Sequence, residues 1–133
     1  MTLSGRRPPP QLIALYRDAM LRLLQTWGDV ERAVGPVEIT SWWRSPSTNR
    51  QTRGAATHSQ HLFGAAMDGK VRGMTRAQLL PHVQRYAARH GVSAPTAPSE
   101  ASGTTVHVQS LPVGTVQRVI ARDPAFFSRL GIA

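Results

Sequence analysis

The segment SQHLFGAAMD, residues 59–68, brings a histidine and an aspartate into one short stretch of chain. His61 and Asp68 stand seven positions apart, and Gly64 and Ala66 between them are small. Because small residues let a neighbouring backbone approach closely, we expect residues 64–71 to form a strand within a sheet. From spacing alone, a surface histidine and a turn aspartate remain the simpler interpretation.

A second histidine stands within an alternating apolar pattern further along the chain. The stretch TTVHVQ, residues 104–109, alternates as a strand does, with Val106 and Val108 on either side of His107. A histidine there faces either a core, where it must be hydrogen-bonded, or a cleft, where it can act. Two imidazoles and one carboxylate are the ligand set of a catalytic zinc site, which keeps a fourth position for water. The chain has no cysteine, so a metal site must be built from His, Asp and Glu.

The N-terminal third predicts an arm, a helix and a strand. Residues 1–10, which end in three prolines, are expected to form a flexible arm, and residues 11–133 a single domain. An apolar stripe at helical spacing predicts a helix that begins at residue 11 and ends at Gly28. The β-branched and aromatic run PVEITSWW predicts a strand over residues 36–43, with one of Trp42 and Trp43 in the core and the other beside a cleft.

Further helices follow. Thr75 and Gln78 form a capping box, which predicts a helix from residue 75 to about residue 90. Pro81 should kink that helix or delay its start, and His90 near its end is expected to be solvated. Shorter helices are predicted after residue 46, over residues 113–122, and after the Asp-Pro pair at 123–124.

Composition excludes several classes of protein. With 133 residues, 41% hydrophobic and 17% charged, the chain is not a disordered, collagen-like or coiled-coil protein. A net charge of +9 favours a polyanionic partner, whether nucleic acid, teichoic acid or an acidic cell-wall surface. Arginine makes up fifteen of the sixteen basic residues, a bias that genomic GC content would also produce. No apolar run reaches the roughly 20 residues of a membrane span, and prolines stand where a signal peptide needs an apolar run.

Two motifs resemble a known family. The first is S-x-H-x-x-G-x-A-x-D, present here as Ser59, His61, Gly64, Ala66 and Asp68. It resembles the zinc-binding motif of the D-Ala-D-Ala metallopeptidases, which belong to the hedgehog-like superfamily of peptidoglycan carboxypeptidases and phage endolysins. Upstream, the segment SWWRSPSTN is similar to the S-G-Y-R-S-x-x-x-N segment of that family, and the match falls on Ser41, Arg44, Ser45 and Asn49. The VHV triplet at residues 106–108 is similar to the strand that carries the third zinc ligand.

The resemblance implies a fold and a set of roles. The fold would be α+β, a small antiparallel sheet with helices packed around it. Zinc (Zn2+) would be bound by His61, Asp68 and His107. Arg44 would polarise the scissile carbonyl or stabilise the developing oxyanion, although it could instead be a plain surface charge. Substrate contact or ordering of the loop is implied for two residues, Ser59 and Asn49.

The sequence departs from the family pattern in two places. Many relatives carry an aspartate two residues after the third ligand, where this chain has Gln109. The family also needs a carboxylate to move a proton during hydrolysis, and Glu100 is the candidate within the loop before His107. A solvated loop glutamate is the alternative interpretation of Glu100.

The resemblance predicts a zinc-dependent peptidase that hydrolyses peptide bonds of bacterial peptidoglycan, in its stem or cross-link peptides. A short single domain without an export signal is typical of phage lytic enzymes, so we expect a monomer made in the cytoplasm that acts at the cell wall. The alternative is a zinc-fold module that binds the cell wall with weak or no hydrolysis. Specific nucleic-acid binding is not expected, because none of the known nucleic-acid motifs is present.

Overall fold

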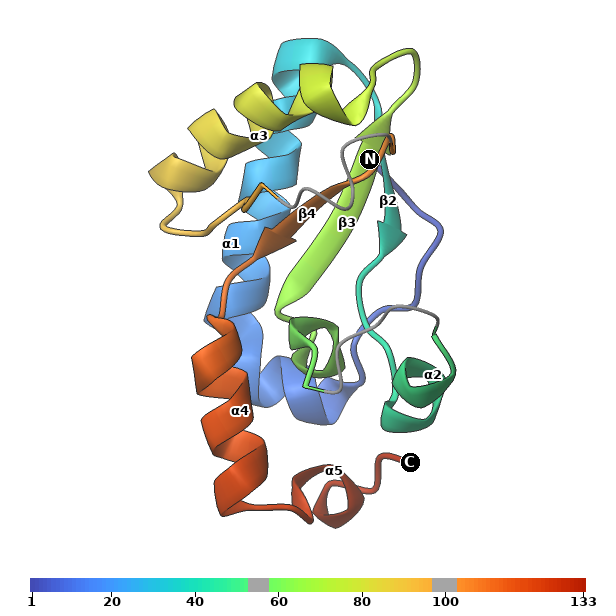
Figure 1. Ribbon diagram of the computed structural model, residues 1–133, viewed down its shortest axis with the longest axis vertical. Helices are drawn as coiled ribbons and strands as arrows, with labels where there is room; N and C mark the ends of the chain where they lie inside the picture. Colours follow the sequence, from blue (N-terminus) through green and yellow to red (C-terminus); the bar gives the residue numbers. More distant parts are fainter. Residues whose placement is uncertain (53–57, 97–102) are drawn as a thin grey trace.

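The computed structural model describes residues 1–52, 58–96 and 103–133. Its elements follow one another as β1 (Thr2–Leu3), α1 (Pro10–Val34), β2 (Val37–Ser41), α2 (Pro46–Gln51), the short 3₁₀ helix η1 (Gln60–Phe63), β3 (Ala66–Val71), α3 (Arg76–Arg89), β4 (Val106–Gln109), α4 (Val113–Arg122) and α5 (Phe126–Arg129). Strands β2, β3 and β4 lie side by side, and α1 and α3 pack together behind them (Figure 1).

The sheet has the order β1-β2-β3-β4. The β2–β3 and β3–β4 pairs are antiparallel, as expected, whereas β1 is a parallel edge strand beside β2. The α+β architecture is therefore confirmed, with a mixed sheet. Thr2 and Leu3 pair with Glu38 and Ile39, so part of the segment 1–10 expected as a flexible arm is a strand of this sheet.

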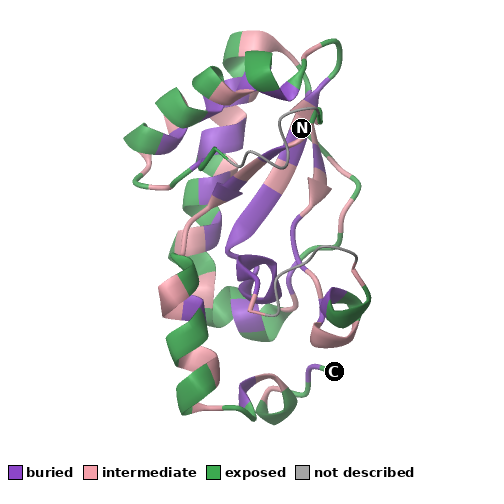
Figure 2. Ribbon diagram, in the orientation of Figure 1, coloured by how far each residue is buried: buried purple, intermediate pink, exposed green. Residues whose placement is uncertain are grey.

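The two faces of the sheet differ in character because side chains alternate along each strand. On β3, Met67 and Val71 are buried toward the helices, together with Val106 and Val108 of β4. The other face carries the side chains of alternate residues, including Asp68, which lies opposite His107 in the β3–β4 register. Figure 2 shows how buried residues concentrate along the middle of the sheet and the helix surfaces behind it.

Helix α1 continues past Gly28, so the prediction that it ends there is wrong. Trp27 and Val30 are both fully buried and carry the apolar stripe through the glycine. Glycine costs only about 1 kcal/mol within a helix, which burial of these neighbours offsets. The helix ends instead at Val34, followed by Gly35, whose φ of 116° suits glycine.

Helix α3 confirms its predicted start. The Thr75 side chain accepts a hydrogen bond from the Gln78 backbone N–H, and the Gln78 side chain accepts one from the Thr75 N–H. Pro81 lies inside the helix and does not delay its start. Val83 and Ala87, which follow the proline, are buried, so packing holds this part of the helix. No helix in the described residues has the length and apolar character needed to span a membrane.

Candidate metal centre

Three side chains from three elements converge on one point of the sheet. His61 comes from η1, Asp68 from β3 and His107 from β4, and one ligand atom of each lies within 4.8 Å of the others. The two imidazole ring centroids are 5.3 Å apart. Within the part of the chain that the structure describes, this is the one cluster of three or more such residues that could hold a metal ion. The structure therefore brings together the three residues expected as ligands, although 39 positions of sequence separate Asp68 from His107.

The tight turn around η1 places His61. The Ser59 hydroxyl caps η1 by accepting a hydrogen bond from the His61 backbone N–H at 3.2 Å. Gly64 ends the turn with φ of 68°, and a Cβ there would lie 2.6 Å from a Pro8 side-chain atom. Only glycine suits this position on both counts, because the backbone is left-handed and there is no space for a side chain.

One hydrogen bond defines which nitrogen of His61 faces the cluster. The Nδ1 atom lies 2.7 Å from the carbonyl oxygen of Trp42. Because a carbonyl only accepts, Nδ1 carries the proton and donates it, which leaves Nε2 with its lone pair. Nε2 lies 3.2 Å from Asp68 Oδ2. A ring held by a backbone carbonyl in this way is the usual arrangement of a metal-ligating histidine.

His107 contacts Asp68 on one side and Gln109, which Gln60 holds in turn, on the other. Its Nδ1 lies 2.8 Å from Asp68 Oδ1, and its Nε2 lies 3.1 Å from Gln109 Oε1. The same Gln109 oxygen accepts a hydrogen bond from Gln60 Nε2 at 3.0 Å. Nδ1 faces the cluster, and with a metal on Nδ1 the ring proton would lie on Nε2 and be donated to Gln109 Oε1. The departure from the family pattern at position 109 thus places an amide, instead of a carboxylate, behind His107.

Asp68 is ionised at neutral pH. Burial raises its pKa, but its close interactions with the His107 and His61 rings outweigh burial and hold the pKa of this carboxyl well below its usual range. The Thr40 hydroxyl also donates to the Asp68 carbonyl oxygen at 3.3 Å, which ties the β3 backbone to β2. A carboxylate and two imidazole nitrogens directed at one point form a donor set that suits zinc.

Arg44 lies next to the cluster and is half-buried, so it is not a plain surface charge. Its Nη2 donates to Ser59 Oγ at 3.1 Å, and its backbone N–H donates to the His61 carbonyl at 3.2 Å. Burial lowers the pKa of the guanidinium and the Asp68 charge raises it. Its Nε is buried without a hydrogen-bond partner among the described residues. The Arg44 side chain therefore retains a donor beside the cluster.

The two tryptophans differ from expectation. Both are buried, Trp42 at 8% exposed and Trp43 at 6%, so both belong to the core, and not one alone as expected. Trp42 Nε1 donates to the Gly64 carbonyl at 2.9 Å and Trp43 Nε1 to the Leu62 carbonyl at 3.0 Å. They hold the turn that carries His61 against the end of β2. The strand stops at Ser41, so strict alternation no longer applies at these two residues.

The other expected site residues lie elsewhere. Asn49 is buried on α2, which carries none of the three clustered residues, and its backbone N–H donates to the Ser45 carbonyl at 2.8 Å. Glu100, the candidate proton carrier, lies outside the described residues. The contact between Gln60 and Gln109 was not anticipated, since nothing in the sequence relates two glutamines 49 residues apart.

A comparison with protein-family models gives one match. The model described as Peptidase M15 matches residues 7–108, which include all three clustered residues and Arg44. Neither the curated proteins nor the solved structures contain a significant match to this chain. The matched region covers most of the chain and includes both motifs with their spacing. The chain therefore belongs to the peptidase M15 family, a family of zinc-dependent metallopeptidases.

Proposed function

We propose that this protein is a zinc-dependent peptidase that hydrolyses peptide bonds in the stem or cross-link peptides of bacterial peptidoglycan. The observation that carries the proposal is the cluster of His61, Asp68 and His107 with one ligand atom from each within 4.8 Å. Membership of the M15 family supports metallopeptidase activity and a peptide substrate. The peptidoglycan substrate and a carboxypeptidase or endopeptidase mode of action are our extension of it.

The three clustered side chains would hold the metal. Nε2 of His61, a carboxylate oxygen of Asp68 and Nδ1 of His107 are the atoms turned toward one another. Zinc, when bound, supplies a Lewis acid and lowers the pKa of water to about 7.

The chain supplies the remaining groups. The Arg44 guanidinium would donate to the carbonyl oxygen of the bond being cut, where negative charge develops. Ser59 positions that guanidinium by accepting from Nη2 at 3.1 Å, and Asn49 would order the neighbouring loop. Glu100 would accept a proton from water and deliver it to the leaving amine.

The net charge of the chain supports a role in lysis of the cell wall. A net charge of +9 would favour adhesion to an anionic cell wall. We propose a monomer made in the cytoplasm and acting at the wall, as phage lytic enzymes do. Deletion of the gene from a phage that encodes it should delay lysis or infection, and an unchanged course of both would contradict this role.

Elemental analysis of dialysed protein tests the metal site first. We expect one zinc per chain in the wild type and none in His61→Ala or His107→Ala. His82→Ala is the matched control, because His82 is exposed on α3 and should leave the zinc content unchanged. A folded wild-type protein that takes up no zinc when offered it would contradict the proposal.

Digestion of purified peptidoglycan tests the reaction. Zinc-loaded wild type should release peptides, and Glu100→Gln should bind zinc normally but release them far more slowly. General acid–base groups contribute about 10²–10⁴-fold to such rates. Zinc-loaded wild type that sediments with cell walls and cleaves nothing would instead identify a cell-wall-binding module.

A further inference from the structure

A second polar row lies beside the metal centre on the same face of the sheet. Lys70 follows Asp68 by two positions on β3, so both side chains point to the same face. Glu38 of β2 lies opposite Lys70 in the register, as His107 of β4 lies opposite Asp68. Residues two apart on a strand are separated by roughly 6.6 Å, so the Lys70–Glu38 row begins about two residues of extended peptide from the metal centre.

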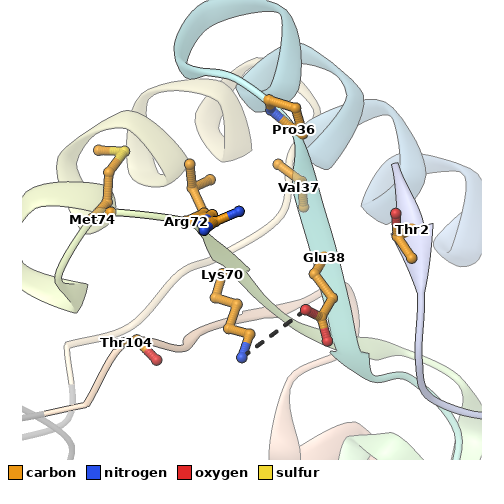
Figure 3. A pocket seen from close by; sticks show the side chains of 10 residues that line it. Thr2, Pro36, Val37, Glu38, Lys70, Arg72, Met74 and Thr104 are labelled. Atoms are coloured by element: carbon orange, nitrogen blue, oxygen red, sulfur yellow. Dashed lines mark ion pairs between the residues drawn. The ribbon is translucent and has the colours of Figure 1, made fainter.

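Lys70 and Glu38 line a pocket. A cavity of about 430 Å³ is lined by Lys70 and Glu38 together with Thr2, Arg72, Met74 and Thr104. Figure 3 shows Lys70 and Glu38 directed toward each other across the pocket, with Arg72 and Thr104 among the other residues that line it. Small-molecule sites typically occupy about 300–1,000 Å³, so this cavity has room for one or two groups of a bound peptide.

The charged groups of the pocket leave the Lys70 ammonium available to bind an anion. Lys70 Nζ and Glu38 Oε1 are 4.0 Å apart, beyond hydrogen-bond distance, and the two side chains are 43% and 42% exposed. The other carboxylate oxygen of Glu38 accepts a hydrogen bond from Ser4 Oγ at 2.5 Å, so Glu38 is already held from the β1 side. With Arg72 also in the lining, two cations stand against one carboxylate. The ammonium of Lys70 therefore keeps donors for an anionic ligand.

We propose that the pocket around Lys70 is a substrate subsite that binds a free carboxylate of the peptide whose scissile bond lies at the metal centre, one or two residues away. The inference rests on the proposed peptidase function and adds its specificity, a preference for anionic over neutral peptides. Thr2 and Thr104 supply hydroxyls to the pocket, and Met74 supplies apolar contact for the adjoining aliphatic part. Glu38 orients the ammonium and disfavours a positively charged group at this position.

The composition of the chain makes a direct test available. Lys70 is the only lysine in the sequence. Reductive methylation with ¹³C-formaldehyde keeps the positive charge and labels only the Lys70 amine and the α-amino group, and a Lys70→Arg variant identifies the Lys70 signal. Two pairs of probes are used: N-acetyl-D-Ala-D-Ala and N-acetyl-L-Ala-D-Glu, each as the free acid and as its neutral amide. NMR spectra of the zinc-loaded, methylated protein report binding at Lys70 and any hydrolysis of the peptide together.

The expected result is a saturable shift of the Lys70 methyl signal with at least one free acid, at a Kd about tenfold lower than for its amide. Equal shifts with acid and amide, or no shift with either acid at saturating concentration, would overturn the subsite. A larger shift with the neutral amides would also overturn it. Hydrolysis is a separate result: cleavage of a probe without a selective shift removes the subsite alone, whereas a selective shift together with no release of peptides in the peptidoglycan digestion removes the proposed reaction.

Kinetics give a second readout. Lys70→Ala should raise KM for the anionic peptide about tenfold with little change in kcat, and Lys70→Arg should restore most of the loss, because the positive charge returns. KM for the neutral amide should be the same in all three proteins. A fall in kcat with an unchanged KM would show that Lys70 does not act through substrate binding. Arg22→Ala is the matched control, because Arg22 is exposed on α1, behind the sheet, and pairs with Asp18.

Discussion

The two faces of β3 perform different tasks with adjacent residues. Toward the helices, Gly69 lies so close to α1 that a Cβ at this position would stand 2.8 Å from the Trp27 ring. On the opposite face, Asp68 and Lys70 meet polar partners from the neighbouring strands. A strand whose side chains alternate can therefore anchor a core and present a reactive group within two residues. We expect substitutions on the helix side to change stability and substitutions on the open side to change metal or substrate binding.

The largest expected effect is on the helix side. Trp27 is fully buried against Gly69, and Trp27→Ala should lower the free energy of unfolding by about 3–5 kcal/mol. Urea denaturation of the metal-free protein measures the change. Leu15→Ala on the same helix is the control, because Leu15 is 55% exposed and should cost far less. Equal losses for the two variants would contradict the division between the faces.

On the open side, Asp68→Asn should separate metal binding from folding. It removes the charged ligand while nearly preserving its shape, so zinc affinity should fall by more than about 100-fold, beyond the 10–100-fold typical of residues behind the ligands. Competition with a chromophoric chelator measures the affinity, and far-ultraviolet circular dichroism checks the fold. If Asp68→Asn retained wild-type zinc affinity, the cluster would not be the metal centre.

Substitution of Gln109 tests the hydrogen bond that supports His107 from behind. Gln109→Leu removes the acceptor 3.1 Å from His107 Nε2 and should weaken zinc binding by about 10–100-fold without changing the metal stoichiometry at saturation. Gln60→Leu, which removes only the donor behind Gln109, should have the same sign and a smaller effect. A larger loss of zinc affinity in Gln60→Leu than in Gln109→Leu would contradict the inference that Gln60 acts on His107 through Gln109.

The smallest expected effect concerns a polar link between the two helices behind the sheet. His90, expected to be solvated, has its Nε2 2.7 Å from Asp29 Oδ2, which joins the end of α3 to α1. The hydrogen bond with His90 lowers the pKa of Asp29, with Arg32 adding to the effect and burial opposing it. Asp29→Asn should therefore cost about 1 kcal/mol of unfolding free energy near neutral pH.

The sign of the pH dependence follows from the lowered pKa. A carboxyl whose folded pKa is depressed stabilises the fold fully above its unfolded pKa of about 3.9 and loses that contribution as the pH falls through the folded pKa. The difference between wild type and Asp29→Asn should be full at about pH 6 and shrink below about pH 4. Urea midpoints at the two pH values check it, and a difference that grows on acidification would refute the link.

Local patterns predicted many of the elements of the fold correctly. The capping box at Thr75, the alternation around His107 and the helix over residues 113–122 were all recognisable, because caps and periodicity depend on residues close in the chain. The end of α1 could not be recognised from the sequence, since the burial of Trp27 and Val30 overrides the low helix propensity of Gly28. The positions of Trp42 and Trp43 were missed for a similar reason: the indoles donate to the carbonyls of Gly64 and Leu62, at the end of η1 and within it, about twenty residues further on.

The sequence by itself determined the chemistry available to this protein: two histidines and an aspartate at the spacing of a zinc-site motif, no cysteine, and one lysine among sixteen basic residues. Only the tertiary structure decided which atoms meet. The β3–β4 register places His107 opposite Asp68, the Trp42 carbonyl turns Nε2 of His61 toward them, and the β2–β3 register sets Glu38 beside Lys70. The physical reason is that register depends on burying the whole apolar face of the sheet against α1 and α3, because a slip of one residue in β2, β3 or β4 would turn the polar side chains of that strand into the core.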